Sequence, residues 1–226
     1  GNVKKISNHI MKKVADKLEE MFKSNREDFE KKWDDIKIFM EYGMLSEDKF
    51  FERADKFTLY KTTEDEYLTF EELTKKIEKI QKNKDKNVVY LYTSNVEEQH
   101  AYIQAAKDKG YTVLIMDTPL TGHFVQKLEQ KSGKINFARV DADTIDKLIE
   151  KDEKIPSKLS EKDEEKLKPV FEDVLDKEKF TVQFESMSEG DGPITITQPE
   201  FMRRMKDMNS IGGGNPMMMG SLPEMY

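Results

Sequence analysis

The chain has 226 residues, of which 37% are charged, and its formal net charge is −7. This length allows one domain and part of a second, and the acidic balance argues against a nucleic-acid or anionic-membrane binder, since both need a basic face. The absence of cysteine excludes disulfides, thiolate zinc sites and cysteine nucleophiles. No apolar run approaches the length of a membrane span, and the start lacks a signal-peptide pattern, so we expect a soluble, cytoplasmic protein.

The amino-terminal part of the chain has the pattern of a coil of helices. Apolar residues recur at steps of three and four over residues 2–23, which is the spacing of one buried helix face. A capping box from Ser24 to Glu27 predicts the start of a second helix, because the hydroxyl and the carboxylate can satisfy free backbone donors there. Trp33 is expected in the core face of that helix and Gly43 at its end. A third, shorter helix follows.

The periodicity changes after Tyr67, where strand patterns begin. A capping box from Thr69 to Glu72 predicts another helix. Continuous apolar runs of strand length then occur at residues 88–92, 112–116 and 135–140. Helices are predicted between these runs, one starting from a capping box at Ser94 and one ending near Gly133. This βαβαβ pattern predicts a short parallel sheet covered by helices on both faces.

A charged segment separates this unit from the carboxyl-terminal part of the chain. Between residues 146 and 168, 15 of 23 residues are charged, which indicates a solvated linker that enters a helix at Ser160. That helix is expected to be kinked or restarted at Pro169. Further on, apolar residues alternate over residues 180–184 and 194–196 on either side of a turn-rich stretch, which predicts a hairpin.

The last predicted helix is unusual in carrying methionine on its apolar face. Thr197 and Pro199 are expected to set its start. Apolar side chains then follow at steps of three and four: Phe201, Met202, Met205 and Met208. Methionine is flexible and polarizable, which suits a surface that must fit many partners. Packing of this helix on a part of the protein outside the chain is an equally good explanation, and the residues alone leave both open.

The expected carboxyl edge of the sheet carries the main candidates for metal or phosphate chemistry. Four polar residues follow the predicted strands there: Ser94, Asp117, Asp141 and Asp143. Open parallel sheets bind ligands at this edge, so a small α/β phosphate-binding or metal-dependent enzyme domain is the alternative function. A calcium loop is excluded because Asp146 stands where that loop needs glycine, and no glycine-rich phosphate loop follows any strand. We favour capping of the next helix by Asp141 and Asp143.

Four segments of the sequence, in their order and spacing, resemble the middle region of one known family. They are FMEYGMLSED at residues 39–48, YLTFEEL at 67–73, VYLYT at 89–93 and GYTVLIMDTPL at 110–120. The family is that of the ninety-kilodalton heat-shock chaperones, and the similarity is greatest to its bacterial type, HtpG. It continues through the charged linker and the methionine helix, so it spans essentially the whole chain.

The resemblance implies an α/β fold, α+β overall, in four parts. Residues 1–60 are expected to be the helical coil of the middle domain, and residues 61–145 its small α/β/α subdomain with the short parallel sheet. Residues 146–159 are the charged linker. Residues 160–226 are expected to be part of the carboxyl-terminal domain, with the hairpin and the methionine-rich helix. The chain is then a fragment of a longer protein.

The resemblance also implies a function. Proteins of this family are ATP-driven, homodimeric chaperones of the stress response that bind unfolded or partly folded client proteins and assist their folding. The nucleotide-binding domain, the loop that completes the ATPase site and the dimer-forming helices would lie outside this chain. We therefore expect a non-catalytic fragment that holds no cofactor, while ATP and magnesium act in the full-length protein. Its expected partners are clients, its own amino-terminal domain and the dimer partner, with no nucleic acid and no membrane.

Client-contact residues carry over from the family only where the residues match. The exposed client-binding helix of the family's carboxyl-terminal domain resembles the methionine helix, which implies this role for Phe201, Met202, Met205 and Met208. A second family contact is an exposed aromatic residue after the second strand of the small subdomain, and it falls at His123 and Phe124. We expect these residues to form the client-binding surface, and we expect no catalytic or metal-binding residue in the chain.

Overall fold

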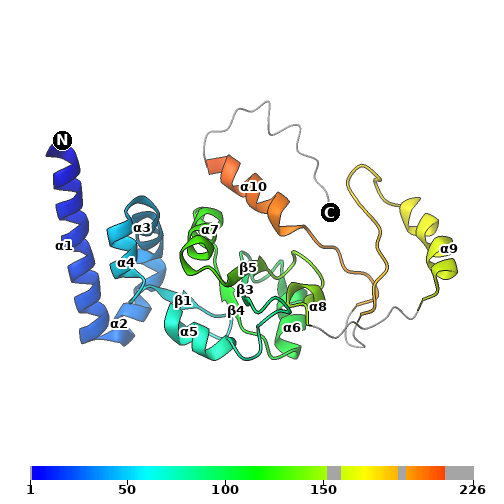
Figure 1. The fold of residues 1–226 in the computed structure, drawn as a ribbon, viewed down its shortest axis with the longest axis horizontal. Coiled ribbons are helices and arrows are strands. Elements are labelled where there is room, and N and C mark those ends of the chain that lie inside the picture. The colour runs from blue at the N-terminus through cyan, green and yellow to red at the C-terminus, as the bar shows by residue number, and fades with distance from the viewer. Residues whose placement is uncertain (1, 152–158, 188–191, 212–226) are drawn as a thin grey trace.

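The computed structural model describes residues 2–151, 159–187 and 192–211, and it shows an elongated molecule in three consecutive parts. Figure 1 shows a helical coil at the amino-terminal end and a small sheet with its helices in the middle. Of the two carboxyl-terminal helices, the first lies beyond this middle part and the second lies over it. The α/β class predicted from the sequence is confirmed, because helices combine with one parallel and one antiparallel sheet.

The coil consists of α1 (Asn2–Ser24), α2 (Arg26–Lys31), α3 (Trp33–Ser46) and α4 (Asp48–Ala54). The predicted capping box is wrong, since α1 continues through Ser24 and the Asn25 side chain instead accepts the Asp28 N–H at 3.1 Å. The second predicted helix also breaks in two at Lys32, which has φ −93° and ψ −2°. Trp33 is buried, as predicted.

The sequence predicted Gly43 at the end of its helix, but this residue lies inside α3. A Cβ atom at this position would come within 2.6 Å of the Phe50 ring and 3.1 Å of the Met11 methyl carbon. Glycine is needed there because α1 and α4 approach α3 too closely to leave room for a side chain. Helix α3 continues past Gly43 to Ser46 and ends where the backbone of Glu47 becomes extended.

Two small sheets follow the coil. Strands β1 (Leu59–Lys61) and β2 (Tyr67–Thr69) form an antiparallel pair that the sequence pattern did not predict. Helix α5 (Phe70–Ile77) starts from the predicted capping box, in which Thr69 and Glu72 accept each other's backbone N–H. The second sheet is the predicted parallel one, with strand order β4-β3-β5. Its strands and helices are β3 (Val88–Thr93), α6 (His100–Asp108), β4 (Val113–Ile115), α7 (Thr121–Ser132), β5 (Ile135–Arg139) and α8 (Ile145–Leu148).

The connection from β3 to α6 differs from the prediction. Helix α6 begins at His100, and no capping box forms at Ser94. The Asn95 side chain instead accepts the N–H groups of Glu97 and Glu98, at 3.1 and 3.2 Å. Asparagine bonds readily to the backbone just after it, and this local turn replaces the first part of the expected helix.

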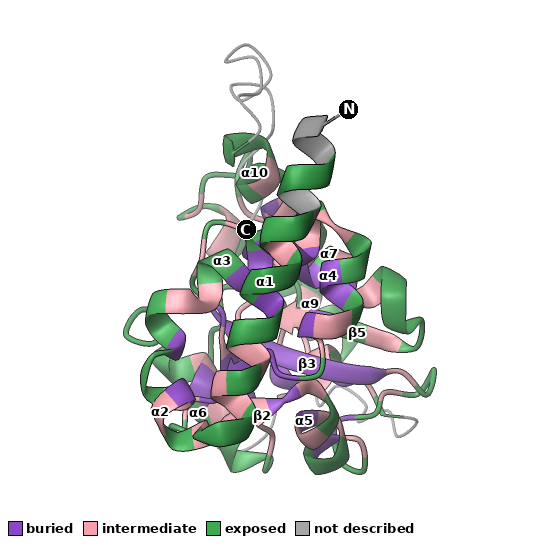
Figure 2. Ribbon diagram, turned by 90° about the vertical axis from the view of Figure 1, so that its left-hand side faces the viewer, coloured by how far each residue is buried: buried purple, intermediate pink, exposed green. Residues whose placement is uncertain are grey.

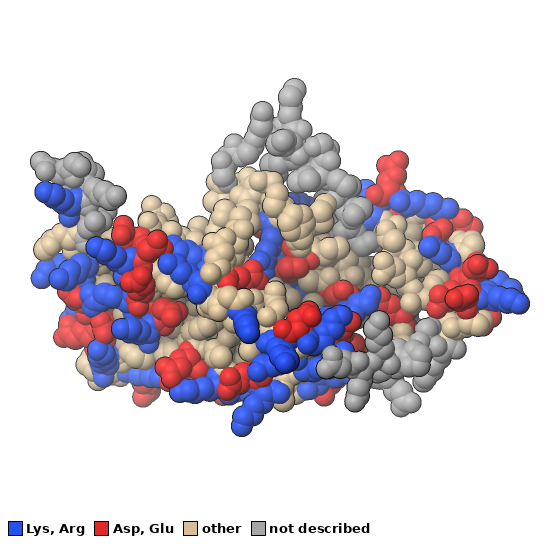
Figure 3. Space-filling view, viewed as in Figure 1, with Lys and Arg blue, Asp and Glu red and all other residues tan. Residues whose placement is uncertain are grey.

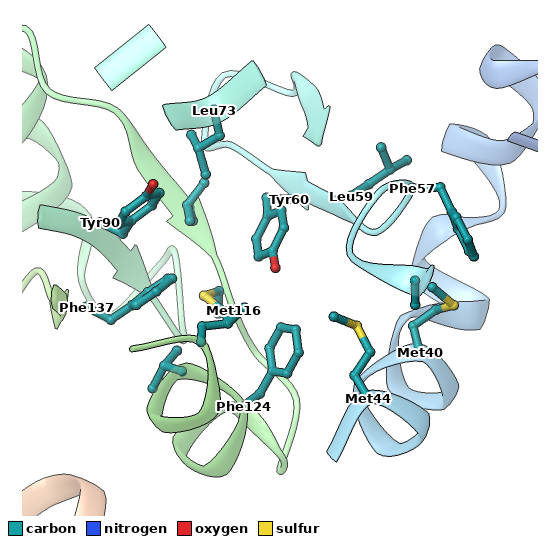
Figure 4. Close-up of a cluster of buried hydrophobic side chains, with 14 of the residues drawn as sticks. Met40, Met44, Phe57, Leu59, Tyr60, Leu73, Tyr90, Met116, Phe124 and Phe137 are labelled. Atoms are coloured by element: carbon teal, nitrogen blue, oxygen red, sulfur yellow. The ribbon is translucent and has the colours of Figure 1, made fainter. Parts of the chain in front are cut away.

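The central strand β3 is buried along its whole length and has core on both faces (Figure 2). Tyr90 and Tyr92 belong to the larger cluster, in which side chains of the coil, β1 and α7 meet (Figure 4). Val89 and Leu91 belong to the smaller cluster beneath α6 and α8. The larger cluster is continuous from the coil to the sheet, so these two parts share one core. Ile149 is buried in the smaller cluster, so the packed α/β unit, from β1 onward, extends past residue 145.

Helix α9 (Glu161–Glu172) follows the charged segment. Of the linker expected at residues 146–159, residues 152–158 lie outside the described part of the chain, and the first few belong to α8. Ser160 caps α9 as predicted, because its hydroxyl oxygen accepts the N–H three residues further on, at 3.3 Å. The helix continues through Pro169 as one element, so of the kink or restart expected there, the restart does not occur.

The hairpin predicted for the next segment is wrong. In the described residues, neither 180–187 nor 192–199 forms a strand. Both segments bond to the α/β unit instead: Glu185 pairs with Lys147, and a tyrosine hydroxyl of α6 donates to the Ile196 carbonyl. Alternating apolar residues indicate an extended chain but do not determine its hydrogen-bond partners. Here these partners are groups of the α/β unit and not a second strand.

Helix α10 (Glu200–Ile211) is the predicted methionine helix. It lies beside α7, over the α/β unit (Figure 1). The Pro199 carbonyl accepts the Arg203 N–H at 3.2 Å, so the helix starts there and Thr197 lies before it.

Replacing Gly43 by alanine is expected to destabilise the coil. The methyl group would have to displace the Phe50 ring or Met11, and over-packing of this kind costs about 1–3 kcal/mol. The better helix propensity of alanine offsets about 1 kcal/mol. We expect a net loss of up to about 2 kcal/mol, seen as a lower urea midpoint. Tyr42→Ala is the control because Tyr42 is 62% exposed, and equal losses for both variants would contradict this explanation.

Candidate functional site

Helix α10 is joined to the carboxyl edge of the parallel sheet at its very start. The Gln198 N–H donates to the Asp141 carbonyl at 2.9 Å, directly after β5. The Arg139 N–H, at the end of β5, donates to the Glu200 carboxylate at 3.0 Å. These bonds place the first turn of α10 over the ends of β3 and β5, where the sequence suggested a ligand site.

The Glu200 carboxylate is the centre of a buried polar cluster. Its Oε1 atom accepts the Tyr92 hydroxyl at 2.8 Å and Arg204 Nε at 2.7 Å. Its Oε2 atom accepts Arg203 Nη2 at 2.6 Å in addition to the Arg139 N–H. A carboxylate offers about four acceptor positions, so this one is fully used. We call the group the Glu200 cluster, and its members are Tyr92, Glu129, Arg139, Glu200, Arg203 and Arg204.

Two arginines supply the positive charge of the Glu200 cluster. Arg203 is only 4% exposed, and its guanidinium lies 5.5 Å from the Tyr92 ring centroid while donating to the hydroxyl at 2.5 Å. Arg204 donates to Glu129 of α7 at 2.8 and 3.1 Å and to the Phe137 carbonyl of β5 at 2.7 Å. The two side chains therefore bind α10 to β3, α7 and β5 together.

The charges of the cluster compensate one another. Burial would raise the pKa of Glu200, but the charges of Arg203 and Arg204 outweigh burial and lower it. Burial raises the pKa of the Tyr92 hydroxyl, which therefore stays neutral and donates to Glu200. Removing one partner from a buried pair typically costs about 3–5 kcal/mol, so the cluster holds α10 in one orientation.

The outer face of α10 carries exposed apolar side chains. Phe201 is 71% exposed and Met205 is 40% exposed. Met202 is half-buried. Met208 is half-buried against α7, where its Cγ atom would lie 3.2 Å from a Cβ placed on Gly122. Of the predicted client-binding residues on this helix, two therefore face solvent and two are partly covered, and Figure 3 shows uncharged surface over the helix.

The second pair of predicted client-binding residues lies on α7. Phe124 is 1% exposed, and its ring stacks on Tyr60 at a centroid distance of 6.5 Å inside the larger core (Figure 4). The exposure expected for this aromatic residue is therefore wrong, because the side chain fills the space between the sheet and the coil. His123 is half-buried and follows Gly122, the residue on which Met208 packs.

Polar residues expected to bind a ligand at the sheet edge are occupied by protein groups. Arg139 forms a bidentate pair with Asp141, at 2.6 and 2.7 Å, and donates to the Ser94 hydroxyl at 3.2 Å. Asp117 follows the strand on the other side of β3 and pairs with Lys37 of α3 at 2.7 Å. The structure therefore brings Ser94 and Asp141 together through an arginine, while Asp117 belongs to a different junction.

Asp143, the remaining edge residue, accepts the N–H of Thr144 at 2.8 Å. Thr144 occupies the cap position of α8, so the predicted capping of this helix by two aspartates is wrong. Within the ranges that the structure describes, no three histidine, aspartate or glutamate side chains are placed to hold a metal ion.

The polar side of α10 is the feature that sequence reasoning missed. Arginines near a glutamate are the usual pattern of a solvated helix face, so they carry little signal. The spacing of Glu200 to Arg203 and Arg204 does indicate that these three side chains meet on one face. Nothing local indicates that Tyr92 and Glu129, which lie far earlier in the chain, complete the cluster.

Replacing Glu200 by glutamine is expected to release α10 while the sheet stays folded. The amide would leave the buried Arg203 and the partly buried Arg204 without their shared countercharge, at a cost of about 3 kcal/mol. Amide hydrogen exchange should become faster in α10 and stay slow in β3. The folded-state pKa of Glu200 is lowered, so its stabilisation is present above the ordinary pKa of glutamate and is lost as the pH falls through the lowered value.

Asp207→Asn is the matched control for this test. Asp207 also binds Arg203, at 2.9 Å, but its side chain is 49% exposed, so its loss should cost less than about 1 kcal/mol. Unchanged hydrogen exchange of α10 in the Glu200→Gln variant would contradict the anchoring role of the cluster.

Comparison with known proteins places the chain in a family. The model of the Hsp90 protein family matches residues 2–214. The chaperone protein HtpG of Porphyromonas gingivalis is 47% identical over 100% of this chain and 33% of the relative. The same protein of Bacteroides fragilis is 46% identical over 100% of this chain and 34% of the relative. HtpG of Myxococcus xanthus is 24% identical over 95% of this chain and 33% of the relative.

The chain spans about a third of the length of the curated relatives that it matches. Among solved structures, the middle domain of a Plasmodium falciparum heat shock protein is similar, with a TM-score of 0.47, 13% identity, and coverage of 60% of this chain and 57% of that one. Similarity at that level adds nothing to the assignment. In the described residues, every helix is too short or too polar to cross a membrane. Because the family model matches nearly the whole chain, this chain belongs to the Hsp90 family.

Proposed function

We propose that this chain is the client-contact and coupling part of an ATP-dependent molecular chaperone. In support, the relatives that match the whole chain are chaperone proteins. In this proposal the chain acts without catalysis: it presents apolar surface to unfolded or partly folded proteins and transmits domain movement. A role in protein folding under stress and a cytoplasmic location belong to the same proposal.

The observation that carries the proposal is the inverted burial of α10. Surface helices of globular proteins bury apolar side chains and expose charged ones. Helix α10 departs from this pattern, since its buried residue is Arg203, which is 4% exposed, while Phe201 is 71% exposed and Met205 40%. Met202 and Met208 are half-buried. The Glu200 cluster holds the helix by its polar side, so Phe201 and Met205 stay in solvent. An arrangement that keeps apolar surface exposed is expected where that surface has a use in binding.

The chemistry of this surface suits clients without a fixed structure. Phenylalanine and methionine bind through non-directional apolar contact, and methionine adapts its shape to different partners. The segment that leads into α10 exposes two further apolar residues, Ile194 and Ile196, at 67% and 55%. We propose that Phe201 and Met205 make the main contacts, with Met202, Met208 and His123 at the border. Phe124 is left out of this surface because it is buried in the core.

Coupling is proposed to run through the core that the coil and the sheet share. Tyr92 belongs to that core, and its hydroxyl donates to Glu200 at 2.8 Å. One side chain therefore touches both the apolar core that reaches the coil and the polar cluster that holds α10. A displacement of the sheet relative to the coil would act on the client surface through this contact.

The remaining parts of the cycle are proposed to lie elsewhere in the full-length protein. ATP and magnesium would bind an amino-terminal domain, and a second copy of the chain would complete a homodimer. This part of the proposal rests on family membership and on the length of the relatives, about three times that of the chain. Its own amino-terminal domain, the dimer partner and clients are the proposed partners.

The test compares two pairs of exposed apolar residues in the full-length protein. Phe201→Ser with Met205→Ser removes side chains that are 71% and 40% exposed on α10. If a client half covers each side chain, each substitution should reduce the binding free energy by about 1 kcal/mol. The two substitutions together should then weaken client binding about ten- to thirty-fold. Fluorescence anisotropy with a permanently unfolded, labelled model protein measures this change.

The matched control is Phe39→Ser with Tyr42→Ser on α3, whose side chains are 72% and 62% exposed. This pair removes similar apolar surface from another face, so it should change client binding less than about two-fold. The urea midpoint should move little for either pair, because these side chains fill no core. Equal loss of client binding in both pairs, or none in the α10 pair, would contradict the proposal.

A further inference from the structure

The coil meets the α/β unit at a cluster of charged groups between α3 and the loop from β4 to α7. Lys37 of α3 donates to Asp117 of the loop at 2.7 Å and to Asp34 of its own helix at 3.2 Å. One turn further along α3, Glu41 accepts a hydrogen bond from the Thr118 hydroxyl of the same loop. We call Asp34, Lys37, Glu41, Asp117 and Thr118 the joint cluster.

Positive charge is scarce in the joint cluster. Its three carboxylates share the ammonium group of Lys37, which is already bonded to two of them. Lys61 of β1 comes only to 3.9 Å from Asp34. Tyr60 of β1 is neutral, because burial and nearby carboxylates raise its pKa well above the usual value. Lys127 of α7 donates to a backbone carbonyl at the far end of α3. Among the residues that the structure describes, Glu41 therefore has no cation of its own.

Burial decides which carboxylate of the cluster gives up its charge. Glu41 is 6% exposed, whereas the side chains of Asp34 and Asp117 are 56% and 42% exposed. Burial raises the pKa of Glu41 to about 7, and the charge of Asp117 adds to this rise. The Thr118 hydrogen bond and the charge of Lys37 act in the opposite direction and do not outweigh burial.

We propose that Glu41 is the proton-binding residue of the joint between the coil and the α/β unit, and that release of its proton loosens this joint. When protonated, Glu41 is neutral and packs against the loop without a countercharge. When ionised, its buried carboxylate competes with Asp117 for Lys37, and the Lys37–Asp117 pair is a direct link between the two parts. This inference does not depend on the client surface of α10.

The sign of the pH dependence follows from the direction of the pKa shift. The pKa of Glu41 is higher in the folded chain than in the unfolded chain, so folding takes up a proton. The stabilisation is full below the ordinary pKa of glutamate, falls as the pH rises toward 7, and is lost above it. Across this window the unfolding constant should rise by close to ten-fold per pH unit, relative to a chain that cannot ionise at this position.

The first experiment compares the wild-type chain with Glu41→Gln, which keeps the shape of the side chain and cannot ionise. Their urea midpoints should agree near about pH 4.5 and separate as the pH rises to about 7, with the variant more stable. Glu52→Gln is the matched control, since Glu52 is exposed on α4, and it should follow the wild type at every pH. Parallel pH profiles for the wild type and Glu41→Gln would overturn the proposal.

Hydrogen exchange locates the effect. At one alkaline pH, amides of residues 117–121 should exchange faster in the wild type than in Glu41→Gln, and at acid pH they should exchange alike. Equal exchange of this loop at both pH values would show that Glu41 titrates without loosening the joint, and would overturn that part of the proposal.

A direct titration keeps the proposal testable even if Glu41→Gln does not fold. In the wild-type chain labelled with carboxyl-13C glutamate, one resonance should titrate near 7. Asp117→Asn should lower this midpoint, because it removes a like charge and frees Lys37, whereas Thr118→Val should raise it. These opposite shifts assign the resonance to Glu41. Titration of every glutamate in the ordinary range would overturn the proposal.

Discussion

Strand β3 is the element on which the rest of the structure depends. It pairs in parallel with β4 on one side and β5 on the other, and each of its six residues is buried. Side chains alternate between the faces of a strand, so Val89 and Leu91 hold α6 and α8 while Tyr90 and Tyr92 reach the core shared with the coil. The Tyr92 hydroxyl also anchors α10 through Glu200. One buried strand thus positions the coil, the covering helices and helix α10.

The two junctions of the α/β unit each contain a buried carboxylate, and the number of cations beside it decides its state. Glu200 is bonded to Arg203 and Arg204, whose charges outweigh burial and lower its pKa. The cation near Glu41 is Lys37, which is already bonded to Asp34 and Asp117. Burial therefore outweighs the charge of Lys37 and raises the pKa of Glu41 to about 7. The same side chain therefore stays ionised as an anchor at one junction and, in our proposal, binds and releases a proton at the other.

Helix α10 connects this anchoring to the proposed function. A helix that docks through its apolar side chains buries those side chains in the contact. Here buried ion pairs and hydrogen bonds hold the helix, so its apolar residues remain available while its orientation is defined. Membership of the Hsp90 family gives this surface its interpretation, because the relatives that match the whole chain are chaperone proteins. This chemistry supports the proposed clients only as a class: exposed apolar segments of unfolded chains.

The sequence by itself determined the features whose partners lie within a few residues: the helical character of the coil, the capping box at Thr69, the βαβαβ order and the collinear segments that identified the family. Burial and partner choice were decided only by the tertiary structure. Phe124 and Phe201 both stand at apolar helix positions, yet one is 1% exposed and the other 71%. The physical reason is that α7 packs between the sheet and the coil, whereas α10 is held by charged side chains whose partners, Tyr92 and Glu129, lie far away in the chain.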